Sequence, residues 1–122
     1  MKYIRIYADP AGESHFEDVE VELAQARFAP PAPPMNLSSF RPALQYAFCS
    51  FPTGWRGNWH PAPQRQIFFH LSGKVRVEAS DGEVRYFGPG SIFFLEDTTG
   101  KGHFSRVISK TDALSAFVQL PD

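Results

Sequence analysis

Residues 54–73 have the sequence GWRGNWHPAPQRQIFFHLSG, and this stretch decides the fold. Successive side chains of a strand point to opposite faces, so a strand that begins at Gln66 carries Gln66 and His70 on the same face. Pro61 and Pro63 exclude a helix from the segment before it. The stretch therefore predicts a loop that leads into an apolar strand with two polar side chains on one face.

Most of the remaining chain consists of short segments with strand-like alternation. Alternating apolar and polar residues indicate strands with one buried face, and clusters of Gly and Pro separate the segments as turns do. No segment keeps a period of 3.6 residues over a helical length. The pattern predicts one all-β domain over residues 1–122, either a sandwich or a barrel. The expected strands cover residues 3–7, 43–51, 66–71, 75–79, 84–87, 91–95, 104–108 and 113–120.

Residues 1–40 differ from the expected barrel of residues 41–122 because they carry a proline-rich stretch. Residues 19–23 alternate valine or leucine with glutamate, which indicates a further strand. Residues 29–34 hold four prolines in six positions and cannot form a normal strand ladder. We expect this stretch to be an extended arm that crosses the barrel surface or reaches a second subunit.

Composition and charge narrow the choice of partners. The 122 residues carry a formal net charge of -1 and no run of Lys or Arg that could follow a phosphate backbone, so nucleic acid is not an expected partner. No signal peptide is evident at the N-terminus, and no apolar run reaches membrane-spanning length, so we expect a cytoplasmic protein without a membrane partner. The single cysteine, Cys49, lies in an expected strand, which favours a buried and inert thiol over a nucleophile.

The central stretch and a later loop resemble the two sequence motifs of the cupin superfamily. In the first motif five residues separate Gly54 from His60, and Gln66 occupies the place of the family's Glu. The second motif is matched by residues 98–103, TTGKGH, which end at His103. The resemblance covers roughly residues 54–107 and is strongest to small single-domain cupins. It implies an antiparallel double-stranded β-helix, the jelly-roll barrel of the cupins.

Departures from the motifs affect the metal site that many cupins carry. Metal-binding cupins use two His and one Glu from the first motif and one His from the second, whereas this chain has Ala62 and Gln66 at two of these places. The resemblance implies that His60, Gln66 and His103 converge in the barrel mouth. We expect His60 and His103 to act as a catalytic acid and base or, together with Gln66, to hold one divalent ion such as Zn, Fe, Mn or Ni. A neutral amide is a weak ligand, so such an ion would bind less tightly than in a site with Glu.

Further side chains near the motifs are candidates for ligand binding. Phe68 and His70 share a strand face with Gln66, and Trp59 precedes His60, so we expect all of these to contact a ligand. For His70 the alternative is a barrel residue hydrogen-bonded to a neighbour, and for Trp59 it is packing onto the barrel end. The twelve Phe residues of the chain favour an apolar or aromatic ligand.

Charged residues near the motifs are expected to have less specific roles. Arg65 alternates away from Gln66, which favours a solvated or intersubunit position. The pair Glu96 and Asp97 lies in an expected loop, where acidic side chains are usually solvated. Lys101 lies between two glycines and is a weak candidate for anion binding.

The sequence favours a protein that binds a small molecule. An enzyme of lyase, isomerase or dioxygenase type and a non-catalytic sensor or carrier both remain open, although a redox metalloenzyme would need more charged or imidazole donors than the chain offers. We also expect a homodimer joined through sheet edges and the N-terminal segment, because the strand of residues 1–7 has no evident hairpin partner and an unpaired strand edge must be covered.

Overall fold

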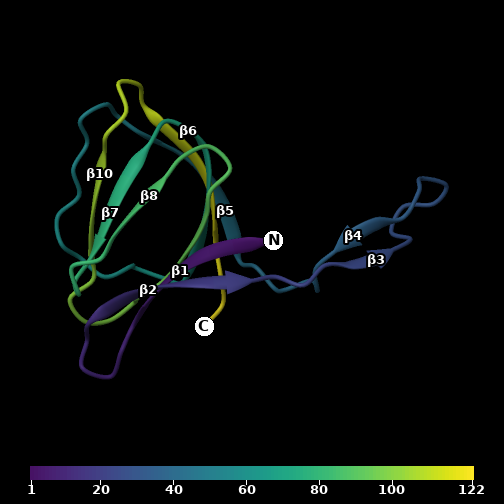
Figure 1. The fold of residues 1–122 in the computed structure, drawn as a ribbon, viewed down its shortest axis with the longest axis horizontal. Helices are drawn as coiled ribbons and strands as arrows, with labels where there is room; N and C mark the ends of the chain where they lie inside the picture. The colour runs from purple at the N-terminus through teal and green to yellow at the C-terminus, as the bar shows by residue number, and fades with distance from the viewer.

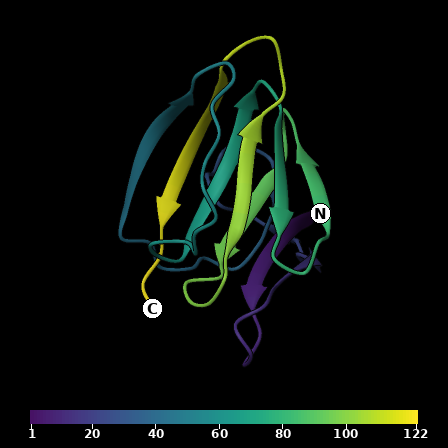
Figure 2. The same cartoon turned by 90° about the vertical axis from the view of Figure 1, so that its left-hand side faces the viewer.

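The computed structural model describes residues 1–122 and contains strands and loops but no helix. Two sheets pack face to face, and a separate two-stranded sheet projects away from them (Figure 1, Figure 2). The expected all-β jelly roll is therefore confirmed, and no helix of the structure could cross a membrane. The strands are β1 (Lys2–Ala8), β2 (Ser14–Glu20), β3 (Ala24–Ala26), β4 (Met35–Leu37), β5 (Gln45–Phe51), β6 (Gln66–Ser72), β7 (Val75–Ala79), β8 (Val84–Phe87), β9 (Ile92–Glu96), β10 (His103–Val107) and β11 (Ala113–Gln119).

The larger sheet has six strands in the order β2-β1-β9-β6-β11-β5, and the smaller sheet has three in the order β10-β7-β8. Every neighbouring pair is antiparallel except β1 and β9, which run parallel with Ile6 opposite Leu95. Because strand partners share a face, the six-stranded sheet turns Ile6, Leu95 and Phe93 toward the smaller sheet.

The hydrophobic core lies between the two sheets. Phe87 of the smaller sheet stacks on Phe93 of the larger one, with ring centroids 4.2 Å apart. Val75 and Val77 are buried beside them because they alternate inward along β7. Burial of each such side chain contributes about 1.5–3 kcal/mol relative to exposure. The core therefore fixes β6, β7, β9 and β10, the strands that carry the candidate site.

Residues 3–7 have strand partners on both sides, and the expectation that they lack a hairpin partner is wrong. The Asp9 carboxylate accepts hydrogen bonds from the backbone N–H groups of Ala11 and Glu13, at 2.9 and 3.0 Å, and so closes a turn that returns β2 onto β1. β9 covers the other side of β1. The edges of this sheet are therefore β2 and β5, not the N-terminal strand.

The proline-rich stretch was expected to cross the barrel surface or to reach a second subunit, and the structure shows that it does not cross the barrel surface. Its flanking residues pair with each other, Ala24 with Leu37 and Ala26 with Met35, to form the β3–β4 hairpin. The prolines occupy the tip of this hairpin, where no ladder hydrogen bonds are needed. Figure 1 shows the hairpin pointing away from the barrel, on the side of the six-stranded sheet. We call residues 24–37 the arm.

Candidate functional site

A cavity of about 250 Å³ lies between the two sheets of the barrel. Its polar lining consists of His60, Gln66, His70, His103 and Ser105. The rest of the wall is apolar and comes from both sheets and from the loop before β6. These apolar residues are Phe51, Trp55, Ala62, Pro63, Phe68, Val75, Val77, Phe93 and Leu95.

The loop of the first motif lies along β10, which carries the His of the second motif. Gly57 N–H donates to the Ser105 carbonyl at 2.8 Å, and two hydrogen bonds of 3.2 and 3.0 Å join the backbones of His60 and His103. Residues directly opposite in an antiparallel pair place their side chains on the same face. The rings of His60 and His103 consequently lie side by side, with their centroids 5.1 Å apart.

Gly102 is required for this close approach of the loop to β10. Its φ of +78° lies in the left-handed region that favours glycine. A Cβ atom at this position would lie 2.1 Å from the backbone oxygen of His60, which no side chain could tolerate without a backbone shift. Gly102, which precedes His103, therefore permits the close backbone approach on which the pairing of the two imidazoles depends.

Asp97 is hydrogen-bonded to the ring of His103 and fixes its position. The expectation that Asp97 is a solvated loop residue is wrong. Its side chain is 0% exposed, and Oδ2 accepts hydrogen bonds from His103 Nδ1 at 2.7 Å and from Ser14 Oγ at 3.0 Å. The signal was present in the sequence, because Phe93, Leu95 and Asp97 continue one inward alternation past the end of β9. Ser14, 83 positions away, had no local signal.

The hydrogen bonds of the two rings define their tautomers. A backbone carbonyl can only accept, so His60 Nδ1 must carry the proton in its bond to the Asn58 oxygen. His103 Nδ1 likewise donates to the carboxylate of Asp97. In the neutral form each ring therefore keeps an unprotonated Nε2. The pair offers two imidazole acceptors side by side in a cavity whose wall is mostly apolar.

His70 lines the cavity on β6 and is buried between aromatic rings. Its ring centroid lies 5.4 Å from that of Phe87 and 6.2 Å from that of Phe68. Burial lowers the pKa of His70 to about 4, so the ring is neutral near pH 7. Its Nδ1 lies 3.4 Å from Ser115 Oγ, whereas Nε2 has no partner. His70 thus contacts a neighbour and also belongs to the cavity wall.

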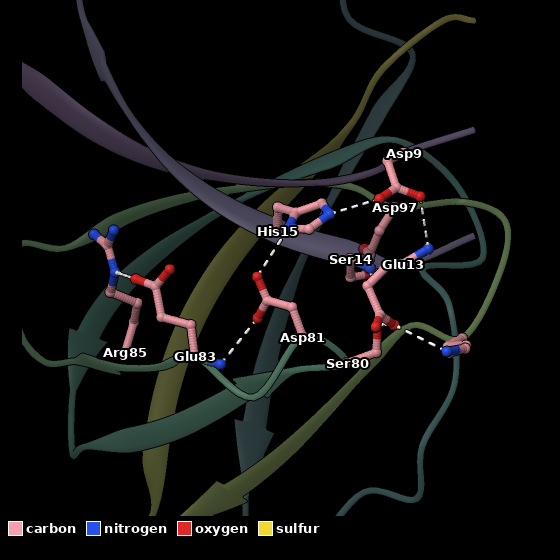
Figure 3. A network of polar contacts seen from close by, with 10 residues as sticks. Asp9, Glu13, Ser14, His15, Ser80, Asp81, Glu83, Arg85 and Asp97 are labelled. Carbon is pink, nitrogen blue, oxygen red and sulfur yellow. Dashed lines mark hydrogen bonds and ion pairs between the residues drawn. The ribbon is translucent and has the colours of Figure 1, made fainter. Parts of the chain in front are cut away.

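A polar network on the surface joins the β1–β2 turn to the β7–β8 turn beside Asp97 (Figure 3). His15 bridges Asp9 and Asp81, at 2.7 and 2.8 Å, and these two carboxylates raise the pKa of His15. Ser14, the residue before His15, points inward and donates a hydrogen bond to Asp97. The network therefore supports the strand that supplies a hydrogen bond to the site.

Several candidates lie outside the cavity. Trp59 is half exposed and packs against Phe104, whereas Trp55 lines the cavity. Arg65 forms an intrachain ion pair with Glu96 at 2.9 Å. Lys101 forms an ion pair with Glu13 at 3.3 Å. The thiol of Cys49 is half-buried, and this burial raises its pKa.

The donor set does not fit a closed metal site of the cupin type. His60 and His103 offer two imidazoles whose Nδ1–H groups are held by oxygen acceptors, as is usual for metal ligands. The third candidate, Gln66, is a neutral amide whose Oε1 accepts a hydrogen bond from Gln119 at 3.5 Å. No carboxylate or thiol lines the cavity, and no group of three His, Cys, Asp or Glu side chains could hold an ion. We derive no chemical step through a metal.

Comparison with known proteins identifies the fold. No protein-family model matches the chain, and no curated protein matches its sequence. The solved structure of the cupin domain of Schizosaccharomyces pombe Cnp3 is similar with a TM-score of 0.53 and 13% identity, over 100% of this chain and 83% of that domain.

Two bacterial structures are also similar to this chain. Protein NMB1881 from Neisseria meningitidis has a TM-score of 0.45 and 17% identity, over 62% of this chain and 72% of its own. The conserved SPY1581 protein of unknown function from Streptococcus pyogenes has a TM-score of 0.46 and 17% identity, over 70% and 71%.

The two packed sheets and the cavity between them define a β jelly-roll protein. More particularly, the likeness to the Cnp3 domain over the whole chain shows that this is a cupin fold, as the two motifs predict. At this level of identity the likeness shows the fold alone.

Proposed function

We propose that this cupin-fold protein binds a small, largely apolar molecule that carries a hydrogen-bond donor such as a hydroxyl group. The observation that carries the proposal is the pair of imidazoles, His60 and His103, side by side in a cavity whose wall is mostly apolar. A concave apolar pocket with a few convergent polar groups is the usual form of a small-molecule site.

The size of the cavity supports a ligand with one ring or a short branched chain. An apolar protein cavity of about 150 Å³ accommodates benzene, and the volume here is about 250 Å³. Phe51, Phe68 and Phe93 present aromatic surface to this space. A ligand of benzene size with one or two substituents therefore matches the cavity.

The polarity of the two rings supports a donor on the ligand. With both Nδ1 protons engaged, the neutral pair presents Nε2 lone pairs and accepts hydrogen bonds. A site built to hydrogen-bond a hydroxyl discriminates against an analogue without it, because its polar atoms then remain unpaired.

The buried carboxylate favours acid–base chemistry of isomerase or lyase type over passive binding. When His103 accepts a proton at Nε2, Asp97 at 2.7 Å from Nδ1 stabilises the imidazolium. The same His103 imidazolium can return that proton to a second position of the ligand, while His60, whose ring lies beside that of His103, accepts a hydrogen bond from the ligand at its unprotonated Nε2. The second candidate is a non-catalytic sensor or carrier that uses the same apolar wall.

The test compares phenol with toluene, which has nearly the same shape but no hydroxyl group. Titrations followed by two-dimensional NMR should show phenol binding several-fold more tightly, since a net hydrogen bond contributes about 0.5–1.5 kcal/mol. His60→Ala and His103→Ala should abolish this preference, whereas His15→Ala, outside the cavity, should retain it. Equal affinity for the two probes, or a preference that survives both cavity substitutions, would contradict the proposal.

A further inference from the structure

The outward surface of the six-stranded sheet is apolar over much of its width. Tyr46 and Phe48 on the edge strand β5 are 74% and 77% exposed, and their ring centroids lie 6.0 Å apart. The register places Phe48 opposite Ala116 and Ala116 opposite Phe69, so these side chains share one face. Leu71 and Leu114 extend the same surface, which we call the outer face.

The arm is a second apolar surface without a cover. It forms a two-stranded sheet that pairs with no other strand, and isolated two-stranded hairpins are only marginally stable in water. Phe28 within the arm is 58% exposed, and its ring centroid lies 5.8 Å from that of Phe40, which is 78% exposed. The arm therefore requires a surface to pack against.

The positions of the arm and the outer face indicate what that surface is. Figure 1 shows the arm leaving the barrel on the side of the six-stranded sheet and pointing away from its own barrel. A groove of about 860 Å³ lies on this same sheet, between residues 38–42 and the side chains of Tyr3, Phe69 and Phe94. A second molecule whose six-stranded sheet faces the first would receive the arm in this groove.

We propose that two copies of the chain pair through their outer faces and exchange arms, so that each arm lies in the partner's groove. Such a contact is isologous: each copy gives an arm and receives one, and the assembly closes as a dimer. This dimer replaces the expected contact through the N-terminal strand, which β2 and β9 already cover.

Charge and area are consistent with a second copy as the occupant. Arg27 is the one charged residue of the arm. The charged side chains that line the groove are mostly acidic, with four carboxylates (Glu20, Glu22, Glu96 and Asp122) against two guanidinium groups (Arg41 and Arg65). The exposed parts of Phe28, Phe40, Tyr46 and Phe48 amount to about 550 Å², taking about 200 Å² for an aromatic side chain. With the leucines of the outer face, this approaches the roughly 800 Å² that each partner buries in a standard interface.

The first test measures mass by light scattering at micromolar concentration. The full chain should have twice the 13.7 kDa chain mass. A variant in which Gly-Ser replaces residues 25–36 should be monomeric and still fold, because Ala24 and Leu37 are ladder partners about 5 Å apart. Phe48→Ser should also yield monomers. The control Tyr86→Ser, at an aromatic residue of the other sheet that is 58% exposed, should remain a dimer.

The second test distinguishes arm exchange from simple contact between the faces. In a Cys49→Ser background, chains with Phe28→Cys are mixed with chains carrying Phe69→Cys, at a side chain that lines the groove, and treated with a short bismaleimide. Arm exchange predicts a covalent dimer that contains one chain of each kind. A monomeric full chain, an armless variant that remains dimeric, or a failure of the mixture to cross-link would overturn the proposal.

Discussion

Substitution of Gly102 by Ala should disrupt both the fold and the pairing of the two site histidines. The φ of +78° costs a non-glycine residue about 1–2 kcal/mol. The new Cβ would lie 2.1 Å from the His60 oxygen, so the loop must move away from β10. That movement weakens the two backbone hydrogen bonds between His60 and His103, each contributing about 0.5–1.5 kcal/mol. The expected loss in the free energy of unfolding is about 3 kcal/mol.

Gly82 provides the matched control for this substitution. It also has a positive φ, +96°, but nothing lies within 4 Å of a Cβ placed there. Gly82→Ala should therefore lose only the backbone term, about 1–2 kcal/mol. Urea unfolding followed by circular dichroism measures both losses. If the two variants lose the same stability, the close approach of Gly102 to His60 does not constrain the site, and the reasoning is refuted.

Three further predictions concern titration and metal affinity. The pKa of His70 is about 4 in the folded state against 6.5 in the unfolded chain, so stability should fall by up to about 3 kcal/mol as the pH drops from 6.5 to 4, and His70→Leu should remove this dependence in urea unfolding. The raised pKa of His15 adds stability that is complete below pH 6.5 and is lost as the pH rises through the folded-state pKa. If the difference in free energy of unfolding between the wild type and His15→Gln does not change over that pH range, the bridge from His15 to Asp9 and Asp81 is disproved. Gln66→Glu should tighten zinc binding in calorimetric titrations, because an ionised carboxylate holds a cation better than an amide; unchanged affinity would place Gln66 away from the ion.

The strands and the position of the cavity could be predicted from local sequence. Alternation at Val75 and Val77 and the turn glycine Gly82 each specify structure over a few residues. The two motifs then brought His60 and His103 to adjacent loops, and the structure places their rings together.

Features that depend on distant residues could not be predicted in the same way. The parallel pairing of β1 with β9 joins residues about 90 positions apart and has no local signal. The role of Asp97 depends on its burial, which the hydrophobic alternation of β9 indicates but the polar loop composition obscured. The prolines of residues 29–34 correctly predicted that no regular strand ladder forms there. The flanking strands β3 and β4 have only three residues each, which is too short for the sequence to indicate a hairpin.

The proposed function requires that a hydrogen-bond donor of the ligand binds at the unprotonated Nε2 atoms of His60 and His103. The most direct measurement is nitrogen NMR of the protein labelled in its four histidine rings, during titration with phenol. In the neutral form of both rings Nδ1 should carry the proton, and phenol should shift the Nε2 resonances of His60 and His103 while those of His15 stay constant. A neutral ring with its proton at Nε2 instead of Nδ1, at either His60 or His103, would contradict this binding mode, as would saturation with phenol without any change at these two Nε2 atoms.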